Sequence, residues 1–229
     1  SGIYTDHVFT EDGKEIAAVT LGSSTDGEGK ISLTLYNKEG KTTHTISQPV
    51  VDGDSITTGK DTIIHETAYD VNGNESAVTD GNGNVTTYTY DAENRLSKVS
   101  VTDKDGKTAV IQQNRYNGDG QRIQKVEGSK TTNYYYQDGV VSYTTDGENS
   151  QTSQNLIGTD GNILATQRYG SDHTDYLLYH KDIQGSTTSL VKEDGSADAT
   201  YQYTDFGETT INGDNKAENE VCYTGGIYD

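Results

Sequence analysis

Strand-forming residues alternate with polar residues along most of this chain. In the run 85–90, Val-Thr-Thr-Tyr-Thr-Tyr, odd-numbered residues take one face of a strand, and Thr86, Tyr88 and Tyr90 take the other. The run 108–111 alternates less clearly but keeps its β-branched residues. Apolar residues nowhere recur at the i, i+3, i+4 spacing of a helix, and only residues 216–219 suit a single helical turn. The pattern predicts an all-β protein.

Turn signals separate these strands. Asp-Gly or Asn-Gly between strand-like runs is a strong hairpin signal, because both residues tolerate the backbone that tight turns require. Predicted turns lie at Asp80-Gly81-Asn82-Gly83, Asp103-Lys104-Asp105-Gly106, Asp160-Gly161, Asp194-Gly195 and Asn212-Gly213. The single proline, Pro49, marks a loop or the edge of a strand.

One short unit, Tyr-Asp/Asn-x-x-Gly/Asn, recurs along the chain. Its copies begin at Tyr36, Tyr69, Tyr90 and Tyr116, with degenerate copies at Tyr136 and Tyr203. The first five copies are separated by 33, 21, 26 and 20 residues. A spacing near 20 residues with insertions indicates a repeat array whose hairpin loops vary in length.

Each unit has a simple physical interpretation. Tyr closes a strand, Asp or Asn begins a turn by binding the backbone two residues on, and Gly or Asn accepts a positive φ. Tyr69, Tyr90, Tyr116 and Tyr136 should therefore occupy equivalent places and carry the packing. Replacing Tyr90 by Ala should then cost on the order of 3 kcal/mol, as for other buried aromatic residues.

Composition supports an ordered but thin core. Only 30% of residues are hydrophobic and the mean hydropathy is −0.81, values that approach those of disordered chains. However, 17 Tyr are spread along the chain beside Thr and Val, with two Phe and no Trp. Tyr combines a large apolar body with a hydroxyl that needs a partner, so the core should lie along sheets with polar edges.

The net charge of −19 excludes several partners. Such a surface repels nucleic-acid phosphates and anionic lipid heads, so no nucleic-acid binding is expected. No apolar run approaches the roughly 20 residues of a membrane helix, so no membrane insertion is expected. A single cysteine, Cys222, excludes an internal disulfide framework. The chain begins at Ser1 and contains no Met, so the lack of a leader here carries no weight.

No catalytic, cofactor-binding or metal-binding residue is predicted. Most carboxylates lie in turn sequences, where turn chemistry explains them without an acid–base pair. The segments 70–74 and 103–106 alternate oxygen-bearing residues like calcium loops but lack the Gly and Glu positions of an EF-hand, so plain turns are favoured. We therefore expect no requirement for a divalent ion in folding. The glycines lie at turns, which argues against a phosphate-binding loop.

Histidine and cysteine give no better site. The histidines are His7, His44, His65, His173 and His180, and none has the spacing of a metal ligand pair. A structural hydrogen bond is the favoured role for His180. Cys222 lies in a strand-like run, Val-Cys-Tyr, with no catalytic signature around it, so a small packed side chain is favoured.

At this point the sequence resembles the YD-repeat, or Rhs-repeat, family. The Tyr-Asp-x-x-Gly units carry the resemblance together with three C-terminal segments. These are Tyr179-His180-Lys181-Asp182-Ile183-Gln184-Gly185-Ser186, Tyr201-Gln202-Tyr203-Thr204-Asp205-Phe206-Gly207, and Tyr223-Thr224-Gly225 with Tyr228-Asp229. They look like the start of the Rhs-associated core. Asn117 and Thr204 stand where the family usually has Asp, which leaves turn formation intact. The match is ordered over residues 69–229 and loose over residues 1–60.

The resemblance implies a fold and a function. The fold class is all-β, a spiral or curved antiparallel β-hairpin repeat array of the YD-repeat shell type. Residues 1–60 would hold loosely matching β repeats, and residues 61–229 would hold YD repeats that run into the Rhs-associated core. Family members form shells around a toxic C-terminal segment, or a barrel in adhesion receptors. The self-cleaving end of the core and any toxin domain lie beyond the matched segments, so no such activity is carried over.

The expected function is therefore a non-catalytic structural shell segment of a large secreted or cell-surface protein, which encapsulates or presents a C-terminal toxin or effector. Its partners would be the remainder of its own polypeptide, without a cofactor. The alternative is a carbohydrate-binding adhesin of a bacterial surface or cell wall that uses exposed Tyr, and a glycoside hydrolase ranks lowest. The segment 221–228 should lack its neighbouring strand, so we also expect unpaired backbone there and weak self-association.

Overall fold

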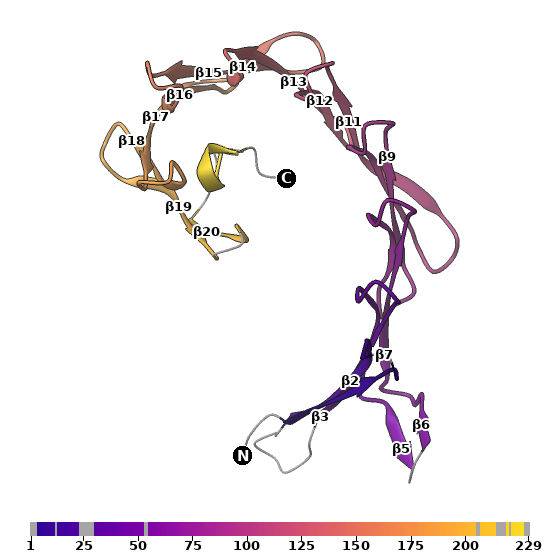
Figure 1. Ribbon diagram of the computed structural model, residues 1–229. Helices are drawn as coiled ribbons and strands as arrows, with labels where there is room; N and C mark the ends of the chain where they lie inside the picture. The colour runs from indigo at the N-terminus through magenta and orange to yellow at the C-terminus, as the bar shows by residue number, and fades with distance from the viewer. Residues whose placement is uncertain are drawn as a thin grey trace. The chain divides into compact units, whose positions relative to one another are not determined.

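The computed structural model describes residues 4–11, 13–22, 30–52, 55–204, 207–213, 219 and 221–226 (Figure 1). Within these ranges the chain forms twenty β-strands and one three-residue 3-10 helix, which confirms the all-β prediction. None of the described helices is long and apolar enough to cross a membrane. The chain divides into two compact units, 1–113 and 114–229, which are described separately.

The first unit is an antiparallel meander with one inserted hairpin. Its strands are β1 (Tyr4–Phe9), β2 (Glu15–Gly22), β3 (Lys30–Tyr36), β4 (Thr42–Ser47), β5 (Val50–Asp52), β6 (Ser55–Thr57), β7 (Ile63–Tyr69), β8 (Glu75–Thr79), β9 (Val85–Tyr90), β10 (Leu96–Thr102) and β11 (Thr108–Tyr116), whose last residues belong to the second unit. β4 pairs directly with β7, and β5 pairs only with β6. This inserted hairpin explains the 33-residue spacing between Tyr36 and Tyr69.

The second unit continues the same plan without an insertion. Its strands are β12 (Arg122–Glu127), β13 (Lys130–Gln137), β14 (Val140–Thr145), β15 (Gln151–Ile157), β16 (Ile163–Tyr169), β17 (Thr174–Lys181), β18 (Thr187–Lys192), β19 (Ala197–Tyr203) and β20 (Thr209–Gly213), followed by the 3-10 helix η1 (Tyr223–Gly225). Each strand from β12 to β19 pairs antiparallel with the next one. Within this unit the strip curls, and η1 lies on its concave side (Figure 1).

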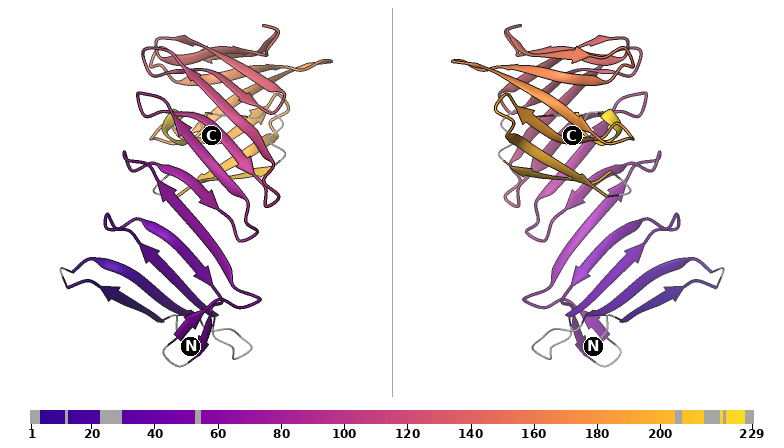
Figure 2. Two further views of the ribbon diagram at one scale, coloured as in Figure 1. Left: turned by 90° about the vertical axis from the view of Figure 1, so that its right-hand side faces the viewer. Right: turned by 90° about the vertical axis from the view of Figure 1, so that its left-hand side faces the viewer.

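In a meander, successive hairpin turns fall at alternate edges of the sheet, as Figure 2 shows. The turns that follow Tyr36, Tyr69 and Tyr90 are separated by an even number of sheet strands, so all three lie at one edge of the first unit. By the same count, the turns after Tyr116, Tyr136 and Tyr203 share one edge of the second unit. We call this edge the tyrosine edge in each unit.

A β-bulge recurs shortly after most turns. The register shifts by one residue at the start of the outgoing strand, so one residue is left without a partner in the ladder. In three such places the unpartnered residue is Thr43, Ser97 or Thr188, whose hydroxyl donates to a carbonyl on the incoming strand at 2.9–3.2 Å. The hydroxyl thus satisfies a carbonyl at the point where the bulge disturbs the ladder.

The main core lies in the second unit. Its buried side chains come from β16 to β19 and from residues 219 and 221–226, which we call the C-terminal segment. They are Ile163, Leu177, Tyr179, Leu190, Ala199, Tyr201, Val221 and Cys222. We call the face of the second unit that carries these strand residues the inner face, and the opposite one the outer face. On β17, Leu177 of the inner face is 2% exposed, whereas its chain neighbour Leu178 on the outer face is 56% exposed. The expected thin core is therefore one-sided.

Several sequence-based expectations can be compared with these elements. The predicted alternation in 85–90 and the turns at 80–83, 103–106, 160–161 and 194–195 are confirmed. The predicted turn at Asn212-Gly213 is wrong, because both residues belong to β20 and pair with β19. Gly213 has a φ of 114° within this strand. A Cβ at this position would lie 2.8 Å from the carbonyl oxygen of Asp198, so the close approach of the two backbones requires glycine.

The C-terminal expectations are only partly accessible. Residues 205, 206, 216–218 and 227–229 lie outside the described residues, and with them most of the expected helical turn and the Tyr-Asp end of the family signature. The backbone at Val221 and Cys222 is not left open as expected, because both carbonyls accept hydrogen bonds from Thr187. The division of the sequence pattern near residue 60 stays a prediction.

Candidate functional site

The repeated turn is the feature that the sequence signature encodes. In the turn that begins at Asp80, the Asp80 N–H donates to the Asn84 carbonyl at 2.9 Å, and the Gly83 N–H donates to the Asp80 carbonyl at 3.0 Å. The same pair of bonds occurs in twelve turns of the described residues. They begin at Thr10, Asn37, Asp70, Asp80, Asp91, Asp103, Asn117, Asp146, Gly158, Asp182, Lys192 and Thr204. The first two of these turns lie in residues 1–60, so the loosely matching region uses the same turn.

The fourth residue of each turn has a left-handed backbone. It is Gly in ten turns, with φ between 80° and 86°, and Asn94 or Asn149 in the other two, with φ of 65° and 66°. A Cβ is unfavourable in this region, and Asn tolerates it better than other residues with side chains. The geometry is that of a three-residue hairpin loop closed by a left-handed residue. The Gly/Asn position of the sequence repeat is thereby explained.

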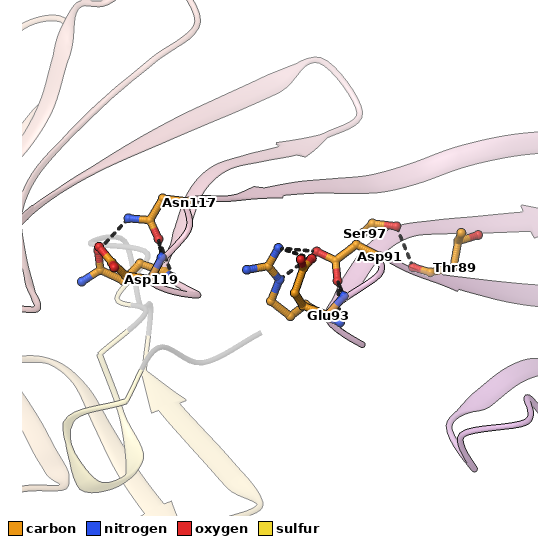
Figure 3. Close-up of polar contacts among 8 residues, drawn as sticks. Thr89, Asp91, Glu93, Ser97, Asn117 and Asp119 are labelled. Atoms are coloured by element: carbon orange, nitrogen blue, oxygen red, sulfur yellow. Dashed lines mark hydrogen bonds and ion pairs between the residues drawn. The ribbon is translucent and has the colours of Figure 1, made fainter.

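Where the first residue of the turn is Asp or Asn, its side chain stabilises the turn by accepting backbone N–H groups. Asp91 Oδ1 accepts the N–H groups of Glu93 and Arg95 at 3.1 and 2.9 Å, and Arg95 Nε donates to Oδ2 at 2.7 Å (Figure 3). Asn117 accepts the equivalent two N–H groups in its own turn, at 3.1 and 2.9 Å (Figure 3). Asn therefore replaces Asp without losing the turn, as expected.

These contacts lower the pKa values of the turn carboxyls. Hydrogen bonds from Asn74 hold the pKa of Asp70 below its usual value, and Asn84 does the same to the pKa of Asp80. The side chain of Arg95 lowers the pKa of Asp91 in the same way. The carboxylates are thus stabilised in their charged form, which suits a structural acceptor and not a general acid near neutral pH.

The signature tyrosines bind the backbone of the neighbouring repeat. The hydroxyl of Tyr69 donates to the Thr42 carbonyl at 2.8 Å. In this bond and in three others, the acceptor is the first residue after the previous turn on the same edge. The other pairs are Tyr90 with Glu75 at 2.9 Å, Tyr136 with Arg122 at 2.8 Å and Tyr203 with Thr187 at 2.6 Å. The predicted equivalence of the repeat tyrosines is confirmed for Tyr69, Tyr90 and Tyr136.

Successive turns of the first unit also contact one another along the tyrosine edge. The fifth residue of one turn reaches the next: Lys14 Nζ donates to the Lys38 carbonyl, and Lys41 Nζ donates to the Gly73 carbonyl. The following pair of turns is joined by amides, with Asn74 Nδ2, again from the fifth position, donating to Asn94 Oδ1 at 2.5 Å. Sequence reasoning missed these contacts, although the run of Lys, Lys and Asn at the fifth turn position was visible.

A second polar cluster ties the C-terminal segment to the inner face. Asn219 is 3% exposed and its Oδ1 accepts the Tyr179 hydroxyl at 2.7 Å. The Thr187 hydroxyl donates to the Val221 carbonyl at 2.7 Å, and the Thr224 N–H donates to Ser186 Oγ at 3.0 Å. Burial beside this segment raises the pKa of Tyr201 to about 12. Sequence reasoning missed Asn219 because nothing in its sequence context marks it as buried.

The residues weighed as sites are placed as follows. Asp103 Oδ1 accepts two backbone N–H groups of its own turn, as Asp70 does, so both suspected calcium loops are built as plain turns. No group of three or more metal-ligating side chains occurs among the described residues. Cys222 is 1% exposed within the core. His180 is exposed, and its carbonyl accepts the Thr188 hydroxyl.

Comparison with known proteins agrees with this repeat geometry. The sequence model of the RHS Repeat family matches residues 69–108, which hold the Tyr69 and Tyr90 units. A tRNA3(Ser)-specific nuclease WapA of Bacillus spizizenii is 33% identical over 167 residues. A tRNA nuclease WapA of Bacillus subtilis strain 168 is 32% identical over 167 residues. Each alignment covers 71% of this chain and 7% of the relative, so the chain spans only a small part of these curated relatives.

Solved structures share the fold. A TcdB2-TccC3-Cdc42 crystal structure and the Photorhabdus luminescens Tc holotoxin pore each match with a TM-score of 0.52 at 13% identity. Each match covers 92% of this chain and 14% of the other. Together, the turns, the tyrosine bonds and these matches define an antiparallel β-hairpin repeat protein. The chain belongs to the YD-repeat, or Rhs-repeat, family.

Proposed function

We propose that this chain is a non-catalytic section of wall in a large secreted or cell-surface YD-repeat protein. The wall encloses or presents a C-terminal toxin or effector of the same polypeptide. One observation carries the proposal: both polar groups of the repeat signature, the Tyr hydroxyl and the Asp or Asn side chain, bind backbone groups of the strip itself. The signature side chains therefore stabilise the sheet, and we assign any catalytic activity to other parts of the protein.

The relatives support the toxin context. The WapA proteins are named as nucleases of tRNA, yet this chain aligns with 7% of their length, and its charge of −19 opposes binding of a polyanion. We assign nuclease-type activity to an effector elsewhere in the polypeptide. The partners of this segment are then neighbouring repeats and that effector, and neither nucleic acid nor a membrane.

The enclosing role can be tested on the parent protein by limited proteolysis. With the strip intact, the effector should be degraded much more slowly than the same effector expressed alone. Equal rates of degradation would overturn the enclosing role. The 229-residue chain incubated with tRNA should leave it intact, and cleavage that persists after further purification would overturn the non-catalytic assignment.

A carbohydrate-binding adhesin is the second candidate, and one observation favours it. Tyr135, Tyr169 and Tyr176 are 36%, 38% and 48% exposed on the outer face. Exposed rings of this kind suit stacking on sugars. These are not the signature tyrosines, whose hydroxyls bind backbone carbonyls. Binding of the chain to a glycan array, lost on replacing Tyr176 by Ser, would support the adhesin, and an array without hits would remove it.

A further inference from the structure

The outer face of the second unit carries an uncharged patch that crosses β13 to β19. Two cross-strand rows form it, and both are defined by strand register. The first row is Tyr135, Tyr143, Gln154, Gln167 and Tyr176, and the second is Leu156, Ala165, Leu178, Val191 and Ala197. We call these ten residues the neutral patch. None of them is charged, although 23% of the chain is.

The patch is exposed and hollowed. Leu156 is 62% exposed, Leu178 56% and Tyr176 48%. Residues of the patch, together with Lys192 and Glu193 beside it, line a groove of about 720 Å³ on β15 to β18. Contiguous exposed apolar surface on a soluble protein marks an interaction site, and loss of charge with enrichment in Tyr is typical of interface centres. The sheet itself does not need these side chains outside, because its core lies on the inner face.

We propose that the neutral patch is the contact surface for a second copy of this chain. The first row supports this inference, because the order of its last four residues, Tyr143, Gln154, Gln167 and Tyr176, is the same from both ends. A copy turned by a half rotation about an axis parallel to the strands sets Tyr opposite Tyr and Gln opposite Gln. This is the self-complementarity that a two-fold interface requires.

Charge and size set the strength of the contact. The neutral patch adds no charge to a face-to-face contact, and the two charged residues that line the groove beside it, Lys192 and Glu193, have opposite signs. The net repulsion therefore comes from the rest of the two −19 chains and is screened by salt. Seven strands spaced about 4.8 Å apart, with two rows about 7 Å apart, give a patch of a few hundred Å². A stable dimer buries roughly 800 Å² per partner. The dimer is therefore weak and salt-promoted.

Sedimentation velocity of the 229-residue chain over a range of concentrations tests this in about 0.05 and 0.5 M NaCl. We expect reversible dimerisation that is stronger at the higher salt. The variant Leu178→Lys lowers the net negative charge and so weakens the repulsion, yet it should weaken dimerisation about tenfold or more because it places a charge in the patch. Val110→Lys is the control, since Val110 is 45% exposed in the first unit and outside the patch.

Circular dichroism establishes that each variant is folded. If Leu178→Lys does not fold, Leu156→Lys replaces it, because Leu156 lies in the same row and is more exposed. A chain that stays monomeric at all concentrations in both salts overturns the proposal. So does dimerisation that is unchanged in a folded patch variant, which would assign self-association to strand edges. Neither result bears on the enclosing role of the parent protein.

Discussion

The hydroxyl of Tyr90 donates a 2.9 Å hydrogen bond to the backbone carbonyl of Glu75, the first residue after the preceding turn on the tyrosine edge. The bond joins two successive repeats. Tyr90 ends its own strand, β9, and its hydroxyl binds the first residue of the neighbouring strand, β8. Removing only the hydroxyl separates this bond from ring packing. Tyr90→Phe should lower the free energy of unfolding by about 1 kcal/mol, the usual net value of such a bond.

Removing the whole ring should have a larger effect. Tyr90 is partly buried, so Tyr90→Ala should lower the free energy of unfolding by about 2 kcal/mol, less than for a fully buried ring. Urea denaturation measures both variants. Tyr176→Phe is the control, because Tyr176 is 48% exposed on the outer face, and it should change stability by less than about 0.5 kcal/mol. A Tyr90→Ala value within that range would contradict a packing role.

The two glycines of one turn offer a matched test of backbone conformation. Gly120 has φ of 80°, whereas Gly118 lacks a left-handed φ, and a Cβ at either position meets no atom within 4 Å. Gly120→Ala should therefore destabilise the protein by roughly 1–2 kcal/mol through backbone strain alone. Gly118→Ala should be neutral or slightly stabilising, because it reduces the freedom of the unfolded chain. Equal melting temperatures for the two variants would contradict the turn geometry.

Acid should loosen the turns in a defined pH range. The folded pKa values of Asp70, Asp80 and Asp91 are lowered by hydrogen bonds. A lowered carboxyl pKa contributes stability that is fully present above the unfolded value, roughly pH 4, and is lost as the pH falls through the folded value. Melting temperatures should therefore fall below about pH 4. Asp80→Asn should flatten this fall, whereas Asp6→Asn, outside the turns, should not.

Calcium should leave the melting temperature unchanged. Asp80 Oδ1 already accepts the N–H groups of Asn82 and Asn84 at 2.8 and 2.9 Å, and Oδ2 accepts Asn84 Nδ2 at 2.8 Å. Binding an ion would have to replace these bonds. Thermal melts with calcium and with a chelator should agree within error. A rise of many degrees in calcium would show that the turns are metal loops, since a ligand that binds only the folded state stabilises it.

The sequence was most informative where chemistry is local. The Asp-x-x-Gly turns were predictable because an Asp side chain, a positive φ and a two-residue strand period all act within a few residues. The turn predicted at Asn212-Gly213 was wrong because the same dipeptide also occurs within strands, where the glycine lets a neighbouring backbone approach closely. The acceptors of Tyr90 and Asn74 lie 15 and 20 residues away, and their pairing depends on the register of the sheet. Such register is not visible in a local pattern.

The buried position of Asn219 gives the last prediction. Its amide joins the C-terminal segment to the inner face through the Tyr179 hydroxyl, at 2.7 Å, and it also donates to the Val221 carbonyl at 2.9 Å. Asn219→Ala removes both hydrogen bonds from a buried site, which should cost about 2 kcal/mol at a net value of about 1 kcal/mol for each bond. Because Cys222 belongs to this segment and is 1% exposed, its thiol reports directly on detachment. Titration with a thiol reagent should find Cys222 protected in the unchanged chain and much faster to react in Asn219→Ala. Asn212→Ala, at an exposed position of β20, should keep it protected. Slow reaction in all three proteins would mean that the segment is held by its apolar contacts alone.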